Sequence, residues 1–299
     1  MVDVESLRKR LARKPILVAP GIYDALTAHL AEQAGFSALY VSGAAIAYTR
    51  LGRPDIGLVA MSEVVDTIAM IRDRVKAHLV VDADTGYGNA LNVGRTVRLF
   101  ERAGATAIQL EDQTFPKRCG HLDNKTLVLA EEMVGKIKAA LDARHSPETL
   151  IVARTDAIAV EGFDRAIARA VSYRDAGADI LFVEAPKTRA ELQRIPPALS
   201  KVPLMANMVE GGKTPPLTAA DLETIGFSLV IFPGGIVRAL ARTASEFYVS
   251  LAAHGTSAPF LERMYDFSAL NEVIGTPQMI SLGQRYEAAA PKNKKGPGT

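Results

Sequence analysis

The chain of 299 residues has few of the residues that cross-link small proteins or stack on nucleic-acid bases. It contains one cysteine, Cys119, no tryptophan, and only 6% aromatic residues. A single thiol excludes an internal disulfide framework and a thiolate zinc site. The scarcity of aromatic side chains argues against a base-stacking surface. A chain of this length can bury a large core without cross-links.

The sequence also lacks an excess of charge of one sign. It has 35 Lys and Arg against 33 Asp and Glu. Three of the lysines lie in residues 291–299, a Lys/Gly/Pro segment that we predict to be a disordered basic tail. The remaining charges are nearly balanced, which is not typical of a nucleic-acid-binding protein.

Long hydrophobic runs are absent as well. The longest uncharged run that we find covers residues 33–49, and glycine and serine interrupt it. It is too short and too polar to span a bilayer. The first residues are charged and amphipathic rather than apolar, unlike a signal peptide. We therefore expect a cytoplasmic protein that binds neither membranes nor nucleic acids.

Short apolar runs recur along the chain, and each is followed by a charged stretch with helical spacing. Continuous apolar runs are typical of parallel strands that are covered on both faces. The predicted strands are Ile16–Ala19, Ala38–Ser42, His78–Ala83, Ala107–Glu111, Leu150–Arg154, Ile180–Glu184, Pro203–Asn207 and Leu229–Phe232.

Eight such units favour an α/β fold of the (β/α)₈ TIM-barrel type over a doubly wound open sheet. Polar residues end nearly every strand, and no GxGxxG motif follows the first one. We assign residues 1–241 to the barrel and residues 242–290 to an arm of additional C-terminal helices. These helices are more than a barrel needs, so they are predicted to cap it or to reach a neighbouring subunit.

Carboxylates follow the third and fourth predicted strands. Asp82 and Asp84 are two residues apart, so a strand would point them to the same side. Glu111 ends the next strand and is a third candidate at this pole. Buried carboxylates are costly without a cation. Oxygen ligands without nearby His or Cys favour Mg²⁺, with Mn²⁺ possible, over zinc.

Strands five to seven end in Arg154, Glu184 and Asn207. An arginine at a barrel mouth can bind a carboxylate with two parallel hydrogen bonds. An alternative is that Arg154, Asp156 and Glu184 only neutralise one another. Charges at the C-terminal face of a barrel more often serve its active site.

The segment Lys117-Arg118-Cys119-Gly120-His121 follows the fourth strand, where barrels carry active-site loops. A lone cysteine is usually an inert apolar residue. Here the neighbouring Lys117, Arg118 and His121 would favour the thiolate, and Gly120 gives the backbone freedom. We therefore predict a catalytic thiol.

Together these motifs resemble the isocitrate lyase/phosphoenolpyruvate mutase superfamily over roughly residues 7–270. The cysteine resembles the lyase branch, with similarity to dimethylmalate lyases, methylisocitrate lyases and petal death protein. The resemblance rests on YVSG at 40–43, DADTGYG at 82–88, EDQ at 111–113, KRCGH at 117–121, ARTD at 153–156 and NMVEGGKTP at 207–215.

The resemblance implies a site and an assembly. It implies Mg²⁺ with Asp84 as a direct ligand and with Asp82 and Glu111 partly acting through water. It also implies a homotetramer, a dimer of dimers whose last barrel helix is exchanged between subunits. The substrate-binding candidates are Ser42, Gly43 and Ala44 for a carboxylate, Arg154 for the 2-oxo oxygen, and Asp55, Gly120, Glu184, Asn207 and Arg238 around them.

The expected reaction is retro-aldol cleavage of a small 2-hydroxy dicarboxylate, a substituted malate or a methylisocitrate-type acid, to a 2-oxo acid such as pyruvate and a second carboxylate. Cys119 would donate the proton, and Tyr40 or a metal-bound water would act as base. Lys117, Arg118, His121 and Arg238 would stabilise negative charge. Phe267 stands where tricarboxylate lyases carry arginine, which favours a dicarboxylate. A phosphonomutase acting on phosphoenolpyruvate or carboxyphosphonoenolpyruvate and an oxaloacetate hydrolase remain alternatives.

Overall fold

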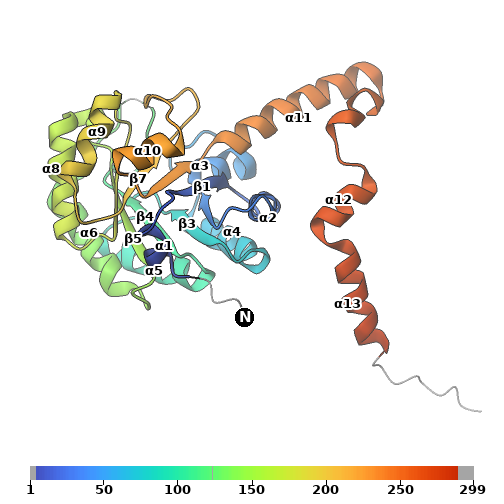
Figure 1. The fold of residues 1–299 in the computed structure, drawn as a ribbon, viewed down its shortest axis with the longest axis horizontal. Helices are drawn as coiled ribbons and strands as arrows, with labels where there is room; N and C mark the ends of the chain where they lie inside the picture. Colours follow the sequence, from blue (N-terminus) through green and yellow to red (C-terminus); the bar gives the residue numbers. More distant parts are fainter. Residues whose placement is uncertain (1–4, 123, 289–299) are drawn as a thin grey trace, which may run out of the picture. The chain divides into compact units, whose positions relative to one another are not determined.

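The computed structural model describes residues 5–122 and 124–288, so the predicted tail at 291–299 lies outside the described residues. Its centre is a closed barrel of eight parallel strands in chain order (Figure 1). The predicted barrel is confirmed. The strands are β1 Leu17–Ile22, β2 Ala38–Val41, β3 His78–Asp82, β4 Ala107–Glu111, β5 Leu150–Thr155, β6 Ile180–Val183, β7 Leu204–Asn207 and β8 Leu229–Phe232.

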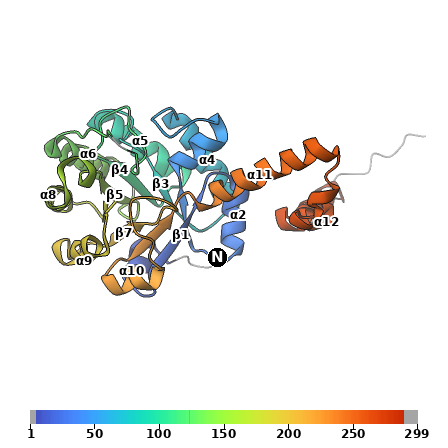
Figure 2. The ribbon, with the colours of Figure 1, turned by 90° about the horizontal axis from the view of Figure 1, so that it is seen from above.

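Helices surround this barrel, and most connect consecutive strands (Figure 2). Short polar caps define their ends: Asn89 accepts hydrogen bonds from the backbone of Leu91 and Asn92 at the start of α5. The helices are α1 Leu7–Leu11, α2 Ala25–Gln33, α3 Gly43–Ile46, η1 Ala47–Leu51, α4 Met61–Arg74, α5 Ala90–Ala103, α6 Ala130–Ala143, α7 Ile158–Glu161, α8 Phe163–Asp175, α9 Arg189–Ala198 and α10 Ala219–Ile225.

The barrel interior is filled by apolar side chains that alternate along the strands. Val80, Val152 and Phe182 belong to this inner cluster, together with Leu7 and Leu11 of α1. The two leucines are almost fully buried. Helix α1 therefore contributes to the barrel's inner core rather than to the outer layer.

The same alternation places the polar residues at the strand ends inside the barrel. Successive side chains on a strand point to opposite faces, so a residue two positions after an inward one is also inward. Asp82 follows Val80, Arg154 follows Val152, and Glu184 follows Phe182 in this way. The apolar core thus turns into a polar layer at the carboxyl ends of the strands.

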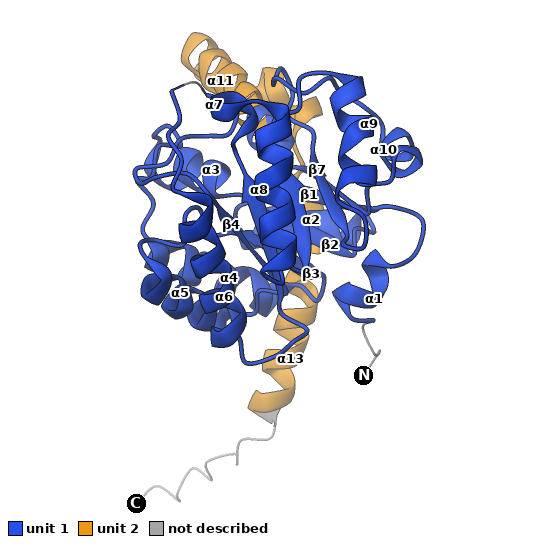
Figure 3. Cartoon of the chain, turned by 90° about the vertical axis from the view of Figure 1, so that its left-hand side faces the viewer, with its two compact units in different colours: residues 1–239 blue, residues 240–299 orange. Residues whose placement is uncertain are grey.

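The chain divides into two compact units, residues 1–239 and 240–299 (Figure 3). Helix α11 Gly235–His254 runs across this division, and the second unit continues with η2 Ala258–Arg263, α12 Phe267–Ile274 and α13 Thr276–Ala288. Within this unit the Phe247 and Phe260 rings pack edge to face, with their centroids 5.4 Å apart. No residue of α12 is buried. None of the helices within the described residues has the combined length and apolarity that a membrane crossing requires.

Candidate active site

A small cavity of about 50 Å³ lies at the carboxyl ends of the barrel strands. Most of the predicted site residues line it. The lining consists of Tyr40, Ser42, Ala44, Asp55, Asp82, Lys117, Cys119, Gly120, His121, Arg154, Glu184 and Asn207, with Val209, Ile231 and Pro233 as an apolar wall that the motifs did not indicate.

Asp82 and Asp84 face the start of α3. A Cβ atom on Gly43 would lie 3.3 Å from Asp82 Oδ2 and 3.4 Å from Asp84 Oδ1. Glycine therefore lets the backbone after β2 approach both carboxylates. The Ser42 hydroxyl accepts a hydrogen bond from the backbone of Ala45 at 3.2 Å, which fixes the first turn of α3.

Lys117 is a buried cation between two carboxylates. Its Nζ lies 2.6 Å from Asp55 Oδ1 and 2.7 Å from Asp84 Oδ1. Burial opposes the charge on Lys117, but the two aspartates outweigh it and its pKa is raised well above the usual value. Burial raises the pKa of Asp84 to about 6, although Lys117 opposes that shift. The lysine is thus committed to an ion pair and does not face the thiol as a free cation.

A second charged cluster surrounds Arg154. Its Nη1 lies 3.2 Å from Glu111 Oε2, its Nη2 lies 3.6 Å from Glu184 Oε2, and its Nε donates to Asp156 Oδ2 at 2.9 Å. Arg154 and Asp156 therefore do neutralise each other, as the alternative interpretation held. The guanidinium still lines the cavity, so it can also reach a ligand.

Asp82, Asp84 and Glu111 could together bind a hard cation, but their present arrangement is not a three-ligand site. Among the described residues, no three side chains of His, Cys, Asp or Glu are arranged to coordinate one ion. Glu111 Oε1 is nevertheless a buried oxygen that accepts no hydrogen bond, whereas Asp84 Oδ1 already lies 2.7 Å from the Lys117 ammonium. Buried acceptors of this kind are costly unless a cation satisfies them. The three carboxylates Asp82, Asp84 and Glu111 are oxygen ligands of the kind that a hard cation prefers.

Tyr40 is poorly suited to act as a base. Its hydroxyl donates to Gln109 Oε1 at 3.1 Å, and Gln109 Nε2 donates to Asp82 Oδ1 at 3.2 Å. Burial and then Asp82 raise the pKa of Tyr40 well above its ordinary value. The phenol is therefore a neutral donor that orients Asp82 through Gln109, and the structure argues against the expected base.

Residues 117–122, here called the Cys119 loop, close over the cavity. The backbone of Cys119 donates to Asp55 O at 3.2 Å. Gln113 holds the backbone of Arg118 through its Nε2 and Oε1 atoms. A Cβ atom on Gly120 would lie 2.4 Å from Arg154 Nη2. Glycine is therefore required for the loop to sit this close to the arginine.

The thiol of Cys119 is a neutral acid in this setting. Burial raises its pKa above the ordinary value, so the expectation that nearby cations favour the thiolate is wrong. Burial also lowers the pKa of His121, although Glu184 opposes this shift. The ring is uncharged at neutral pH, and its Nδ1 accepts the backbone N–H of Lys213 at 3.0 Å. A protonated thiol remains suited to donating a proton.

Two predicted arginines lie outside the cavity lining. The Arg118 side chain is exposed. Arg238 Nη1 lies 3.0 Å from Glu210 Oε2, and both side chains are about half exposed. Glu210 already balances Arg238, and neither arginine faces the cavity to stabilise charge there. Asn207 does line the cavity, and its Nδ2 donates to Glu184 Oε2 at 3.0 Å.

The sequence motifs did not single out three buried polar residues that contact the candidate site residues. They are Gln109 and Asp112 on and after β4, and Lys125 beyond the Cys119 loop, all buried polar side chains that hold site residues in place. The period of two along β4 could have identified Gln109, because it lies two positions before Glu111. Asp112 faces the helices, and Lys125 lies in an irregular segment, so periodicity gives no signal for either.

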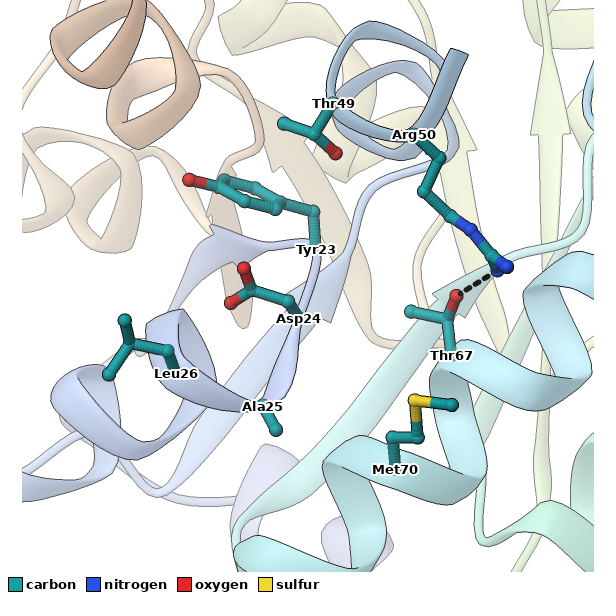
Figure 4. Close-up of a pocket in the computed structure, with 8 residues that line it drawn as sticks. All are labelled: Tyr23, Asp24, Ala25, Leu26, Thr49, Arg50, Thr67 and Met70. Atoms are coloured by element: carbon teal, nitrogen blue, oxygen red, sulfur yellow. Dashed lines mark hydrogen bonds between the residues drawn. The ribbon is translucent and has the colours of Figure 1, made fainter. Parts of the chain in front are cut away.

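A larger cavity of about 510 Å³ lies elsewhere, between α2, η1 and α4 (Figure 4). Its polar groups are largely engaged: Arg50 donates to Thr67 Oγ1 at 3.1 Å, and Asp24 caps α2. The exposed Leu26 and Met70 form its apolar part. It contains no cluster of buried carboxylates, so the smaller cavity is the candidate active site.

Sequence comparisons match this chain to known lyases along most of its length. It is 41% identical to a 2,3-dimethylmalate lyase of Eubacterium barkeri over 286 residues, which cover 96% of this chain and 99% of the relative. It is 46% identical to a 2-methylisocitrate lyase of Aeropyrum pernix over 269 residues, covering 90% of this chain and 86% of the relative.

Solved structures with a similar fold come from the same group of enzymes as these relatives. A crystal structure of 2,3-dimethylmalate lyase, a PEP mutase/isocitrate lyase superfamily member, aligns with a TM-score of 0.89 at 34% identity, covering 98% of this chain and 97% of that one. A phosphonopyruvate hydrolase complex with oxalate and Mg²⁺ aligns with a TM-score of 0.84 at 32% identity, covering 96% and 99%. The family model described as phosphoenolpyruvate phosphomutase matches residues 7–251. The chain therefore belongs to the phosphoenolpyruvate phosphomutase family, within the PEP mutase/isocitrate lyase superfamily.

Proposed function

We propose that this protein is a carbon–carbon lyase that cleaves a 2-hydroxy dicarboxylate, of the substituted malate or methylisocitrate type, to a 2-oxo acid such as pyruvate and a second carboxylate. The observation that carries the proposal is a neutral, partly exposed thiol that lines one small cavity together with Asp82, Arg154 and Glu184. The two relatives named above are lyases of these two types.

The metal of this site is proposed to be Mg²⁺. Asp84 would hold it directly, and Asp82 and Glu111 would complete the site through water; Glu111 Oε1 is a buried oxygen without a hydrogen bond. Oxygen-only ligand sets favour Mg²⁺ or Mn²⁺. When bound, the cation would polarise the substrate's 2-hydroxyl and adjacent carboxylate, and so favour transfer of the hydroxyl proton to a water molecule in the site.

The substrate is proposed to lie with its C1 carboxylate toward the backbone of Gly43 and Ala44 and with its C2 oxygen toward Arg154. Arg154 would stabilise negative charge as the C2–O bond becomes a carbonyl. Glu184 and Asn207, joined by a hydrogen bond, line the cavity next to Arg154. The apolar wall of Val209, Ile231 and Pro233 suits alkyl substituents on the departing half better than a third carboxylate.

Cys119 is proposed to be the proton donor. Cleavage of the C2–C3 bond leaves its electron pair on C3, stabilised by the adjacent carboxylate, while C2 becomes the carbonyl carbon of the 2-oxo acid. The thiol then transfers its proton to C3, and the thiolate is reprotonated from solvent after product release. The raised pKa keeps the thiol protonated until that step.

Replacing Cys119 tests this role. Cys119→Ala and Cys119→Ser are expected to lose turnover by about 10²-fold or more, because general acid catalysis contributes about that much. Binding of Mg²⁺ and pyruvate should remain, because Cys119 is not among the residues proposed to bind the metal or the substrate carboxylate. Turnover is followed by the coupled reduction of the 2-oxo acid, and binding by calorimetry. Near-normal turnover in either variant would contradict the role.

The reaction itself is tested with a panel of 2-hydroxy di- and tricarboxylates, with Mg²⁺ or with EDTA. The proposal expects 2-oxo acid release from a substituted malate or from methylisocitrate, and none with EDTA. Oxalate and acetate formed from oxaloacetate would instead establish a hydrolase. A new phosphonate signal in a ³¹P spectrum after incubation with phosphoenolpyruvate would establish a mutase.

The second unit is proposed to mediate assembly into a homotetramer, a dimer of dimers, by packing against a second copy. Its helices carry exposed apolar side chains, among them Tyr248, Phe267, Met279 and Tyr286. Clustered exposed apolar residues are typical of interfaces between chains. We also propose a cytoplasmic location, because a reducing compartment keeps the Cys119 thiol free.

A further inference from the structure

Lys125 is a buried lysine to which neither the proposed reaction nor the sequence motifs give a role. Its side chain is 1% exposed, and its ammonium group bonds two partners. Nζ donates to the backbone carbonyl of Gly120 in the Cys119 loop and, at 2.8 Å, to Asp156 Oδ1. A buried ammonium is costly unless it is paired. These two bonds are therefore what holds Lys125 inside the protein.

Asp156 is itself a rigid partner. Its backbone N–H donates to Asp112 Oδ1 at 2.9 Å. Asp112 Oδ2 in turn accepts hydrogen bonds from Thr155 and Tyr173, both at 2.7 Å. All four residues are buried. The carboxylate that Lys125 bonds is thus fixed to the end of β5 and does not move with the loop.

Asp156 also orients Arg154. Its Oδ1 accepts from Arg154 Nη2 at 3.0 Å and from Lys125 Nζ at 2.8 Å, so the two cations share one oxygen. The same Arg154 Nη2 is the atom that a Cβ on Gly120 would meet. The loop backbone, the lysine and the arginine therefore meet at one point.

The Cys119 loop must leave this position for substrate to enter. The cavity of about 50 Å³ is much smaller than the roughly 300–1,000 Å³ of typical ligand pockets, so we expect the loop to move when substrate enters. When the loop opens, Lys125 loses the Gly120 carbonyl while it keeps Asp156. Its ammonium is then left with an unsatisfied donor, which favours the return of the loop.

We propose that Lys125 is a positioning residue that couples closure of the Cys119 loop to the alignment of Arg154, by bonding Gly120 and the Arg154 partner Asp156 with one ammonium group. The proposal rests on the proposed function, which assigns the roles of Cys119 and Arg154. It predicts that the loop stays open for more of the time when the ammonium is removed.

The single cysteine of the chain provides the probe, because alkylation of a thiol can report only on this loop. Iodoacetamide labelling of the full-length protein is followed by intact mass at pH 8. We expect Lys125→Met to be labelled about threefold faster or more than the wild type. Loss of a nearby cation would by itself disfavour the thiolate and slow labelling, so an acceleration reports exposure. An unchanged or slower rate would overturn the proposal.

Lys136→Met is the matched control. Lys136 is also buried, and its Nζ donates to a backbone carbonyl, Thr85 O at 3.2 Å, outside the Cys119 loop. Its labelling rate should equal that of the wild type. If Lys136→Met accelerates labelling as much as Lys125→Met, the effect is general loosening and the proposal is wrong. If Lys125→Met does not fold, Lys125→Gln replaces it. The shorter, uncharged head should also accelerate labelling, and an unchanged rate overturns the proposal.

Kinetics give a second readout. With a substrate found in the panel, Lys125→Met should lower kcat by about tenfold or more, with a smaller change in KM, because closure follows binding. Lys125→Arg should recover part of kcat. The positioning role would be contradicted if the two variants changed kcat equally, and also if each changed KM as much as kcat. Labelling needs no turnover, so it still tests Lys125 if the lyase function proves wrong.

Discussion

At the scale of single residues, the site works through side chains whose charges are already paired. Lys117 is held by Asp55 and Asp84, and Arg154 is held by Asp156. Such pairing lets charged groups stay buried at the carboxyl ends of the strands. It also means that few groups are free to change charge state, which leaves the neutral Cys119 thiol as the available proton source.

Gly120→Ala tests how tightly the loop must close. Its Cβ would stand 2.4 Å from Arg154 Nη2 and 2.7 Å from Glu184 Cγ. Both side chains are buried and bonded, so the loop rather than the cavity wall should move. We expect kcat to fall about tenfold or more, with little change in melting temperature.

Gly135→Ala is the control, because a Cβ there meets no atom within 4 Å. Gly135 lies inside α6, where alanine is favoured over glycine by about 1 kcal/mol. This variant should keep full activity and gain slight stability. Normal kcat in Gly120→Ala would show that the loop tolerates displacement.

At the scale of elements, the helix that follows β3 helps to fix the end of that strand. Residues 82–88 pass from β3 to α5 through Asp84 and Tyr87, both with positive φ. Such a backbone is strained for residues other than glycine. The cap formed by Asn89 anchors the far end of this turn, so it stabilises the segment that presents Asp84.

Asn89→Ala should therefore lower the free energy of unfolding by about 0.5–2 kcal/mol, because two backbone N–H groups lose their acceptor. Chemical denaturation measures the loss. Asn89→Ser keeps a side-chain acceptor and should lose much less. If Asn89→Ala and Asn89→Ser lose the same free energy of unfolding, the capping hydrogen bond is not the source of the stability.

Most of the elements could be predicted from the sequence. Strands covered on both faces leave continuous apolar runs, and β4 Ala107–Glu111 and β8 Leu229–Phe232 coincide with their predictions. Helix α11 was predicted to begin at 242 but begins at Gly235. The start was predicted too late because the Gly234-Gly235 pair is typical of a turn. The short helices after β2 were also missed, since residues 43–47 extend an apolar run.

The site was predictable in position but less so in electrostatics. Inward alternation brought Asp82, Arg154, Glu184 and Asn207 to one cavity, as the motifs indicated. Burial decided the rest: it keeps the Cys119 thiol protonated and makes His121 neutral. Which side chains are buried depends on packing between distant segments, and spacing along the chain does not encode it.

At the scale of the whole molecule, the barrel and the second unit differ in how they bury apolar surface. The barrel helices pack on strands, whereas α12 buries no residue and its Phe267 is 87% exposed. Exposed apolar surface of this kind is costly in water. The proposed assembly would remove that cost by covering these helices with a second copy.

Phe267→Asp should therefore reduce the oligomeric state, because a carboxylate would be buried at the interface. Light scattering coupled to size exclusion measures the mass. Ser268→Asp adds the same charge at the next exposed position, about 100° around the helix, and should leave the mass unchanged. A wild-type protein that is monomeric at micromolar concentration would refute the assembly.

Closure of the barrel also has a consequence for synthesis. Leu17 of β1 pairs with Leu229 of β8, so the first strand meets the last across most of the chain. Until β8 has left the ribosome, β1 and β7 each present an open edge. Unpaired edges template aggregation, and contacts between distant residues form slowly. Nascent chains that stop before β8 should therefore depend on chaperones far more than the finished protein does.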